Sequence, residues 1–264
     1  MNNVSIGQYL PFDTFIHRLD PRVKIITSFL FIITIFFVDS FLGYIPFVAL
    51  VALMVGVGKI PVKSLVRSLK PLIYILIITG LINLFTTPGE TLFNLGPLTA
   101  TVEGLHKTVF MLIRLILIVL ATSLLTYTTS PMELTFGLEK LFSPWKRFGF
   151  PAGELAMMVS ISLRFIPTLF QEAQKIKMAQ MARGADFESG NIINRAKNMI
   201  PLLVPLFINA FNRSDDLATA MEARLYRIGR DRTRLNEIFM KKTDYTCLFA
   251  FLSFCAVVII VHYL

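Results

Sequence analysis

The chain has 264 residues, of which 55% are hydrophobic and 16% are charged, and its formal net charge is +9 at pH 7. Soluble domains carry about a quarter charged residues, so this composition excludes an ordinary soluble enzyme and indicates a lipid environment. A basic protein could bind nucleic acid, but that function needs a basic face on a soluble fold. Here the charges stand between long apolar runs, which favours an all-α integral membrane protein.

Residues 1–23 form a separate N-terminal segment. They lack the basic stretch followed by an apolar stretch that marks a secretory signal peptide. We therefore expect this segment to stay uncleaved and to lie in the cytoplasm.

The apolar runs predict about five transmembrane helices, since a spanning helix needs about 20 mostly apolar residues. Four of them fall within residues 24–127, and the last one occupies 244–264. The first four runs lie at 24–38, 43–57, 71–85 and 105–127. A loop that contains Gly and Pro is expected between the third and the fourth.

The distribution of Lys and Arg predicts the orientation, because cytoplasmic loops are enriched in these residues. The segment 59–70 contains four basic residues and no acidic one, whereas the opposite loops contribute Asp39, Glu90 and Glu103. The N-terminus and the stretch 128–243 are therefore expected in the cytoplasm. With an odd number of spans, the C-terminus is expected to be extracellular.

Residues 128–243 are predicted to form a cytoplasmic domain of helices, since structureless connections of that length are unusual. Ser130 and Pro131 are residue types favoured at a helix N-cap and first helical position. Gly137 and Ser143 predict that this first helix is short.

Two long amphipathic helices are expected to follow. The first runs from Pro151 to Gly184, because glycine commonly follows a helix end. The second begins after Asn191, and Pro201 and Pro205 are expected to bend it or delay its start. One face of the second helix has small residues at its centre, which allow a close helix approach, so the two helices are expected to pack together. This predicted packing stripe consists of Leu203, Phe207, Ala210, Ser214, Leu217 and Met221.

The two long helices end in the same short pattern. Ala182-Arg183-Gly184 ends the first and Ala223-Arg224-Leu225 ends the second, and a Phe precedes each Arg by thirteen residues. A cation at a helix C-terminus interacts favourably with the helix dipole, which would explain either motif alone. Because the pattern occurs twice, and arginine presents a rigid five-donor fork to a carboxylate, we interpret both arginines as docking residues.

Several motifs of the chain match those of a known family. They are Ile6-Gly-Gln-Tyr-Leu-Pro11, His17-Arg-Leu-Asp-Pro-Arg22, Leu163-Arg-Phe-Ile-Pro167, the Ala182-Arg183-Gly184 motif and Asp216-Leu-Ala-Thr-Ala-Met-Glu-Ala-Arg224. With these motifs, and with four spans, a helical domain and a final span in order, the chain resembles the transmembrane (T) component of energy-coupling factor transporters.

The resemblance implies a membrane-embedded energy-coupling subunit of an ABC-type importer. Such a subunit transmits the ATP-driven movement of two ABC-type ATPases, expected here as a heterodimer, to a substrate-binding S component that takes up vitamins or other micronutrients. It implies further that Ala182, Arg183 and Gly184 dock on one ATPase, and Ala223 and Arg224 on the other. No cofactor is expected in this chain, because the partner ATPases bind the ATP.

The second motif departs from the family pattern, because Leu225 stands where glycine is usual. Leucine takes the left-handed conformation of a helix cap less readily than glycine. The second long helix is therefore expected to continue through Tyr226 or Arg227.

Three other functions are alternatives to this one. A T component dedicated to cobalt, nickel or biotin uptake fits the same motifs. An integral membrane enzyme would need a convergent acid, base, nucleophile or metal set, and a nucleic-acid binder would use the basic stretch 128–243. The three histidines lack metal-ligand spacing, so no metal site is expected. Arg114 lies within the fourth span, and a structural pairing is the favoured interpretation of this charge.

Overall fold

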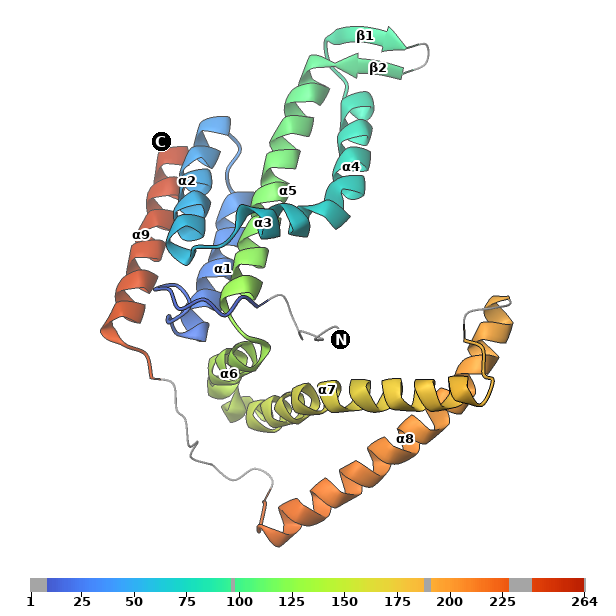
Figure 1. Ribbon diagram of the computed structural model, residues 1–264. Coiled ribbons are helices and arrows are strands. Elements are labelled where there is room, and N and C mark those ends of the chain that lie inside the picture. The colour runs from blue at the N-terminus through green and yellow to red at the C-terminus, as the bar shows by residue number, and fades with distance from the viewer. Residues whose placement is uncertain (1–8, 96–97, 188–190, 228–238, 264) are drawn as a thin grey trace. The chain divides into compact units, whose positions relative to one another are not determined.

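The computed structural model describes residues 9–95, 98–187, 191–227 and 239–263 (Figure 1). Residues 6–8 of the first family motif, residues 228–238 of the predicted helical domain and Leu264 lie outside the described residues. The chain divides into two compact units. We call residues 7–137 with 237–264 the span unit, and residues 138–236, with 1–6, the helix-pair unit.

The span unit is built from helices and one small hairpin (Figure 1). Its elements are α1 (Pro21–Phe36), α2 (Phe41–Gly58), α3 (Val62–Leu69), the 3-10 turn η1 (Lys70–Leu72), α4 (Ile73–Thr86), β1 (Thr91–Leu95), β2 (Leu98–Thr101), α5 (Val102–Thr128), the first part of α6 (Pro131–Phe142) and α9 (Lys242–Tyr263).

Helix α5 is the centre of the span unit and contacts α1, α2, α3 and α4. Its residues Leu117 and Tyr127 join a buried cluster with Phe31 and Ile35 of α1 and Phe47 of α2. The rings of Phe31 and Phe47 meet edge to face with centroids 5.2 Å apart, a favoured aromatic geometry. Apolar packing around α5 thus holds the unit together.

The segment between α4 and α5 differs from the predicted loop. It forms the antiparallel hairpin of β1 and β2, in which Phe93 pairs with Ala100 and Leu95 with Leu98. The residues of Thr91–Leu95 do not alternate strictly between polar and apolar, so the period of two that marks a strand is missing and the sequence did not indicate the hairpin. The backbone N–H of Glu90 donates to the Glu103 carboxylate at 2.8 Å and ties the hairpin to the start of α5.

Five helical stretches among the described residues are long and apolar enough to cross a bilayer. They are α2, the stretch from α3 to α4, α5, α7 (Ala152–Ala182) and α9. The number of these candidate spans agrees with the prediction, but the helices are not all the predicted ones. Helix α1, predicted as the first span, has 16 residues, whereas α7 qualifies because its first half is apolar almost all round.

The start of α6 confirms the predicted cap. The Ser130 backbone N–H donates to the Glu133 carboxylate at 2.9 Å, and the Glu133 N–H donates back to the Ser130 hydroxyl at 3.3 Å, as in a capping box. Gly137, however, does not end the helix. A Cβ there would lie 2.8 Å from the Ile25 side chain and 3.1 Å from Pro21, so the glycine lets α6 approach α1 closely.

The helix-pair unit contains the end of α6, the 3-10 turn η2 (Ser143–Phe148), α7 and α8 (Ile192–Ala223). Helices α7 and α8 have 31 and 32 residues and contact each other, as predicted. The prolines do not delay α8, which begins directly after Asn191 and continues through Pro201 and Pro205.

Candidate docking site

The two arginine motifs end their helices with the same backbone geometry. Arg183 has φ −90° and ψ 8° and is the C-cap of α7, and Arg224 has φ −88° and ψ 12° and is the C-cap of α8. In each case the next residue has a positive φ, +87° at Gly184 and +56° at Leu225. The sequence repeat is therefore also a structural repeat.

The same hydrogen bonds close both ends. Gly184 N–H donates to the Met181 carbonyl and Ala185 N–H to that of Gln180, both at 3.0 Å. At the second end, Leu225 N–H donates to the Glu222 carbonyl at 2.8 Å and Tyr226 N–H to that of Met221 at 3.0 Å. This double closure is the Schellman motif, which satisfies the last helical carbonyls.

The expectation that α8 continues through Tyr226 or Arg227 is wrong. Helix α8 ends at Ala223, and Leu225 takes the left-handed conformation that Gly184 takes after α7. That conformation costs a non-glycine residue roughly 1–2 kcal/mol. The two Schellman hydrogen bonds close the turn at Leu225, as they do at Gly184, where glycine takes the conformation without this cost.

Both arginine side chains are accessible at the ends of their helices. Arg183 and Arg224 are exposed, and so are the alanines that precede them, Ala182 and Ala223. The small methyl groups leave each guanidinium accessible from the side of its helix. Each helix end therefore offers a charged donor fork on a rigid support.

A polar clamp joins the two long helices. Glu172 of α7 accepts a hydrogen bond from the Asn209 side chain at 3.0 Å, and its carboxylate lies 3.2 Å from the Arg213 guanidinium. Asn209 and Arg213 are four residues apart and share one face of α8. With a rise of about 1.5 Å per residue, Arg183 is roughly 16 Å from Glu172 along α7, and Arg224 is roughly 16 Å from Arg213 along α8. The C-terminal ends of α7 and α8 point in different directions (Figure 1).

The predicted packing stripe is only partly on the face of α8 that carries the clamp. Ala210, Leu217 and Met221 are half-buried, whereas Leu203, Phe207 and Ser214 are exposed. The half-buried row instead consists of Leu202, Pro205, Leu206, Asn209, Ala210, Arg213, Leu217 and Met221. Asn209 and Arg213 face α7 because Glu172 binds them, and the spacing of apolar and small residues along α8 does not show this.

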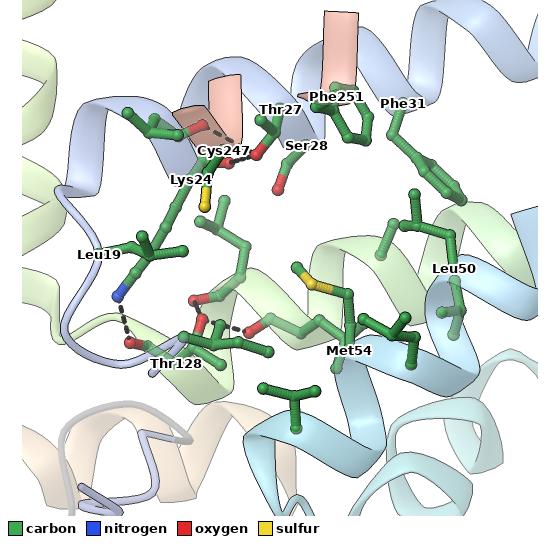
Figure 2. A pocket seen from close by; sticks show the side chains of 18 of the residues that line it. Leu19, Lys24, Thr27, Ser28, Phe31, Leu50, Met54, Thr128, Cys247 and Phe251 are labelled. Atoms are coloured by element: carbon green, nitrogen blue, oxygen red, sulfur yellow. Dashed lines mark hydrogen bonds between the residues drawn. The ribbon is translucent and has the colours of Figure 1, made fainter. Parts of the chain in front are cut away.

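A buried lysine holds the chain together at one end of the span unit. Lys24 donates to the backbone carbonyls of His17 and Thr128, each at 2.9 Å. It lines a mostly apolar cavity of about 470 Å³ that is bounded by residues of α1, α2, α5 and α9 (Figure 2). Figure 2 shows the lysine side chain extended along the wall toward Thr128. Lys24 thus links the N-terminal segment, α1 and the end of α5.

Two buried aspartates join the starts of α1 and α9. Asp20 and Asp244 are each 2% exposed. The Asp244 carboxylate accepts from the Asp20 backbone N–H at 3.0 Å and from the Lys241 N–H at 2.7 Å. Asp20 in turn caps α1 by accepting from the Arg22 N–H at 2.8 Å. No sequence pattern predicts this contact, because the two aspartates are 224 residues apart.

Arg114 makes the structural contacts that its position in a span favoured. Its guanidinium donates to the Tyr44 hydroxyl at 3.0 Å and to the Val38 carbonyl at 2.8 Å, and it lies 3.3 Å from the Asp39 carboxylate. The rings of Phe36 and Phe110 lie 5.5 and 5.1 Å from it. Arg114 therefore fixes the turn between α1 and α2 against α5.

Metal-ligating side chains do not gather in the part of the chain that the structure describes. No group of three or more His, Cys, Asp or Glu residues is placed there so that it could hold an ion.

These features define a class of protein before any relative is considered. Several apolar helices of membrane-spanning length form one unit, and a pair of long helices with matched arginine ends forms the other. This is an all-α integral membrane protein whose second unit is built from a pair of long helices.

Comparison with known proteins places the chain within that class. The family model described as "Cobalt transport protein" (CbiQ) matches residues 12–235. A protein of Thermosediminibacter oceani named energy-coupling factor transporter transmembrane protein EcfT is 51% identical over 251 residues, which are 95% of this chain and 94% of that protein. Proteins of the same name from Clostridium kluyveri and Limosilactobacillus fermentum are 48% and 41% identical, covering 98% and 100% of this chain and 95% and 96% of their own. The chain belongs to the CbiQ family, as a transmembrane energy-coupling component of energy-coupling factor transporters.

Proposed function

We propose that the chain couples two ABC-type ATPase subunits to a substrate-binding S component, through the matched arginine ends of α7 and α8. The observation that carries this proposal is the repeated geometry of the two helix ends, in which Arg183 and Arg224 occupy the same position of the same Schellman motif. A single exposed arginine at a helix end is explained by its favourable interaction with the helix dipole. Two arginines with the same backbone geometry fit two related partners.

In this proposal each guanidinium binds an acidic group in a groove of one ATPase. Arginine is suited to this role because its planar fork binds a carboxylate through two parallel hydrogen bonds. Ala182 and Gly184 flank the Arg183 guanidinium, and Ala223 precedes Arg224. These small residues allow the surface of an ATPase groove to approach each guanidinium closely. ATP stays on the partners, and the chain itself is not an enzyme.

Because the clamp joins α7 to α8, a movement of one arginine end also moves the other helix. When ATP binding changes the separation of the two grooves, Arg183 and Arg224 move with them. The contact at Glu172 turns this change into a rotation of one helix against the other, since packed helices shift between discrete arrangements. The rotation is then passed to the spans and to the S component, which holds the vitamin or other micronutrient.

The proposal includes an orientation. The N-terminal segment and the arginine ends of α7 and α8 lie in the cytoplasm, where the ATPases are, and the C-terminus is extracellular. The four basic residues of segment 59–70 support this orientation because Lys and Arg accumulate on the cytoplasmic side. Cysteine labelling from either side of sealed vesicles tests it.

Arginine substitutions test the docking function. Arg183→Ala, Arg224→Ala and the double variant are purified in lipid nanodiscs and titrated with the ATPase pair. Each single change should weaken binding at least about tenfold, because a buried charge loses its partner, and the double variant should not bind. Lys175→Ala is the matched control, since Lys175 is an exposed cation on α7 away from the tip. Unchanged binding of the double variant would contradict the proposal.

A dedicated cobalt transporter is the second candidate, and the description of the family model favours it. The names of the relatives favour the general energy-coupling role instead. Purification of the native complex and mass spectrometry of its S components separate the two. Several different S components indicate a shared vitamin system, and a single one indicates a dedicated transporter of cobalt, nickel or biotin.

A further inference from the structure

We propose that Leu225 is an apolar anchor, which enters a hydrophobic pocket on the ATPase subunit bound by Arg224. The inference rests on the proposed docking function. It gives the end of α8 an apolar contact that the end of α7 lacks. It predicts that the ATPase at the α8 end has an apolar pocket beside its acidic groove, and that the ATPase at the α7 end does not need one.

The conformation of Leu225 is unfavourable, and its side chain gains little from its own unit. Leu225 has φ +56° and is 81% exposed. Glycine would close the same hydrogen bonds without a steric penalty, as Gly184 does at the end of α7. In the free chain, leucine is therefore the less stable choice at this position.

Lys59 shows how such a turn is used elsewhere in the chain. Lys59 and Leu225 are the non-glycine residues with a positive φ in the described ranges. After Lys59 the turn delivers Ile60, which is 4% exposed, into the core of the span unit. At the end of α8 the apolar residue stands in the turn itself and faces outward. The burial that would offset the strain is missing until a partner supplies it.

Crowding does not explain why the two ends differ. A Cβ added at Gly184 would find no atom within 4 Å. Both ends therefore have room for a side chain and both require a left-handed residue, yet only one carries an apolar group. The difference points to the partners, and two non-identical ATPase sites would account for it.

Leu225 is placed to strengthen the neighbouring ion pair. It follows Arg224 directly, so an ATPase groove that receives the guanidinium also meets the leucine. Apolar groups around a charged contact exclude water, and a lower local dielectric strengthens the attraction between the charges. Residues in sparsely populated backbone conformations cluster at sites of function, in agreement with this role.

Substitutions at Leu225 test the inference with the full chain in nanodiscs and the purified ATPase pair. Leu225→Gly should raise the thermal midpoint of the chain, because the strain is removed, and yet weaken ATPase binding about tenfold, because an apolar contact is lost. Leu225→Ala keeps the strain but shortens the side chain, so it should bind as weakly as Leu225→Gly with a lower thermal midpoint. Leu225→Met keeps the apolar reach and should bind within about threefold of the original chain.

The outcomes separate this inference from the docking function. If Arg224→Ala binds weakly while Leu225→Gly binds as tightly as the original chain, docking stands and the anchor is overturned. If Arg224→Ala binds normally, the docking function fails and the anchor fails with it.

Discussion

Glu172 of α7 and Arg213 of α8 form an ion pair with 3.2 Å between the carboxylate and the guanidinium. The same carboxylate accepts a hydrogen bond from Asn209, one helical turn away from Arg213. The Glu172 side chain is 23% exposed and the Arg213 side chain 40%, so water screens the pair only in part. This contact lies between the two arginine tips along the helix pair and fixes how the helices cross.

Breaking this clamp should loosen the helix pair without removing the tips. Glu172→Ala is expected to lower stability by about 1 kcal/mol, since a partly exposed ion pair and one hydrogen bond are lost. A double-mutant cycle with Arg213→Ala, followed by thermal unfolding, should give a coupling of about 0.5 kcal/mol. Substrate uptake per ATP hydrolysed should fall as well, because the arginine ends of α7 and α8 no longer move together.

Gln171→Ala serves as the control for the clamp. Gln171 precedes Glu172 and is exposed, so its removal should change neither stability nor coupling. Equal effects of the two substitutions, or additive effects of Glu172→Ala and Arg213→Ala, would show that the clamp does not join the helices.

The sequence predicted the helices better than their contacts. Apolar runs, the Ser130 cap and the repeated Ala-Arg pattern are sufficient to predict α1, α2, α4 to α9 and the end of α7, but not the end of α8. Periodicity alone could not show that Asn209 and Arg213 face inward, because polar residues face a partner only where that partner offers a matching group. Glu172 is such a group, and it stands 37 residues earlier in the chain.

Leu225 shows a second limit of sequence reasoning. Its residue type predicts continued helix, since leucine is a good helix former and a poor left-handed residue. The structure places it in the turn, where the main-chain hydrogen bonds to Met221 and Glu222 prevail over the side-chain preference. Local propensity of this size, about 1 kcal/mol, is often overridden by such context.

Loss of the capping box should destabilise the start of α6. Ser130→Ala removes the acceptor for the Glu133 N–H, and the loss of an N-cap costs about 1 kcal/mol. Ser130→Thr keeps the oxygen and should be nearly neutral. Hydrogen exchange of the amides of Met132 and Glu133 measures the effect, and equal protection in the Ala and Thr variants would argue against the cap.

Arg114 should be required for the stability of the span unit rather than for docking. Arg114→Met leaves the Tyr44 hydroxyl and the Val38 carbonyl without this donor, and loss of such charge-assisted bonds costs about 2 kcal/mol. Unfolding in detergent should show this loss, while ATPase binding by the folded fraction stays unchanged. Lys107→Met removes an exposed cation of the same helix and should have little effect. A stable Arg114→Met variant that fails in transport would instead indicate a direct role.

Stability should fall on mild acidification, because of His17. Partial burial lowers the pKa of this imidazole from its usual 6.5, and the positive charge of Lys24 lowers it further, while the backbone of Leu10 and Tyr127 and the charge of Glu133 act in the opposite sense. Tyr9 and Phe12 also place their rings edge-on toward it. Since the folded pKa is the lower one, the unfolded chain takes up the proton first as the pH falls below about 6.5. The stability that neutral His17 provides is therefore complete above that pH and is lost below it.

The measurement is the thermal midpoint of the nanodisc-embedded chain between about pH 5 and pH 7.5, the window set by that lowered pKa. His17→Gln removes the titrating group but keeps a polar side chain near Thr14, whose hydroxyl lies 2.7 Å from the His17 Nδ1. The variant should therefore have a shallower decline toward acid pH than the original chain. Its midpoint at pH 7.5 should be slightly lower, because the amide fits the site less well than the ring. A decline of the same slope in both proteins would assign the acid sensitivity to the carboxylates instead, and a steeper decline in the variant would reverse the sign argued for His17.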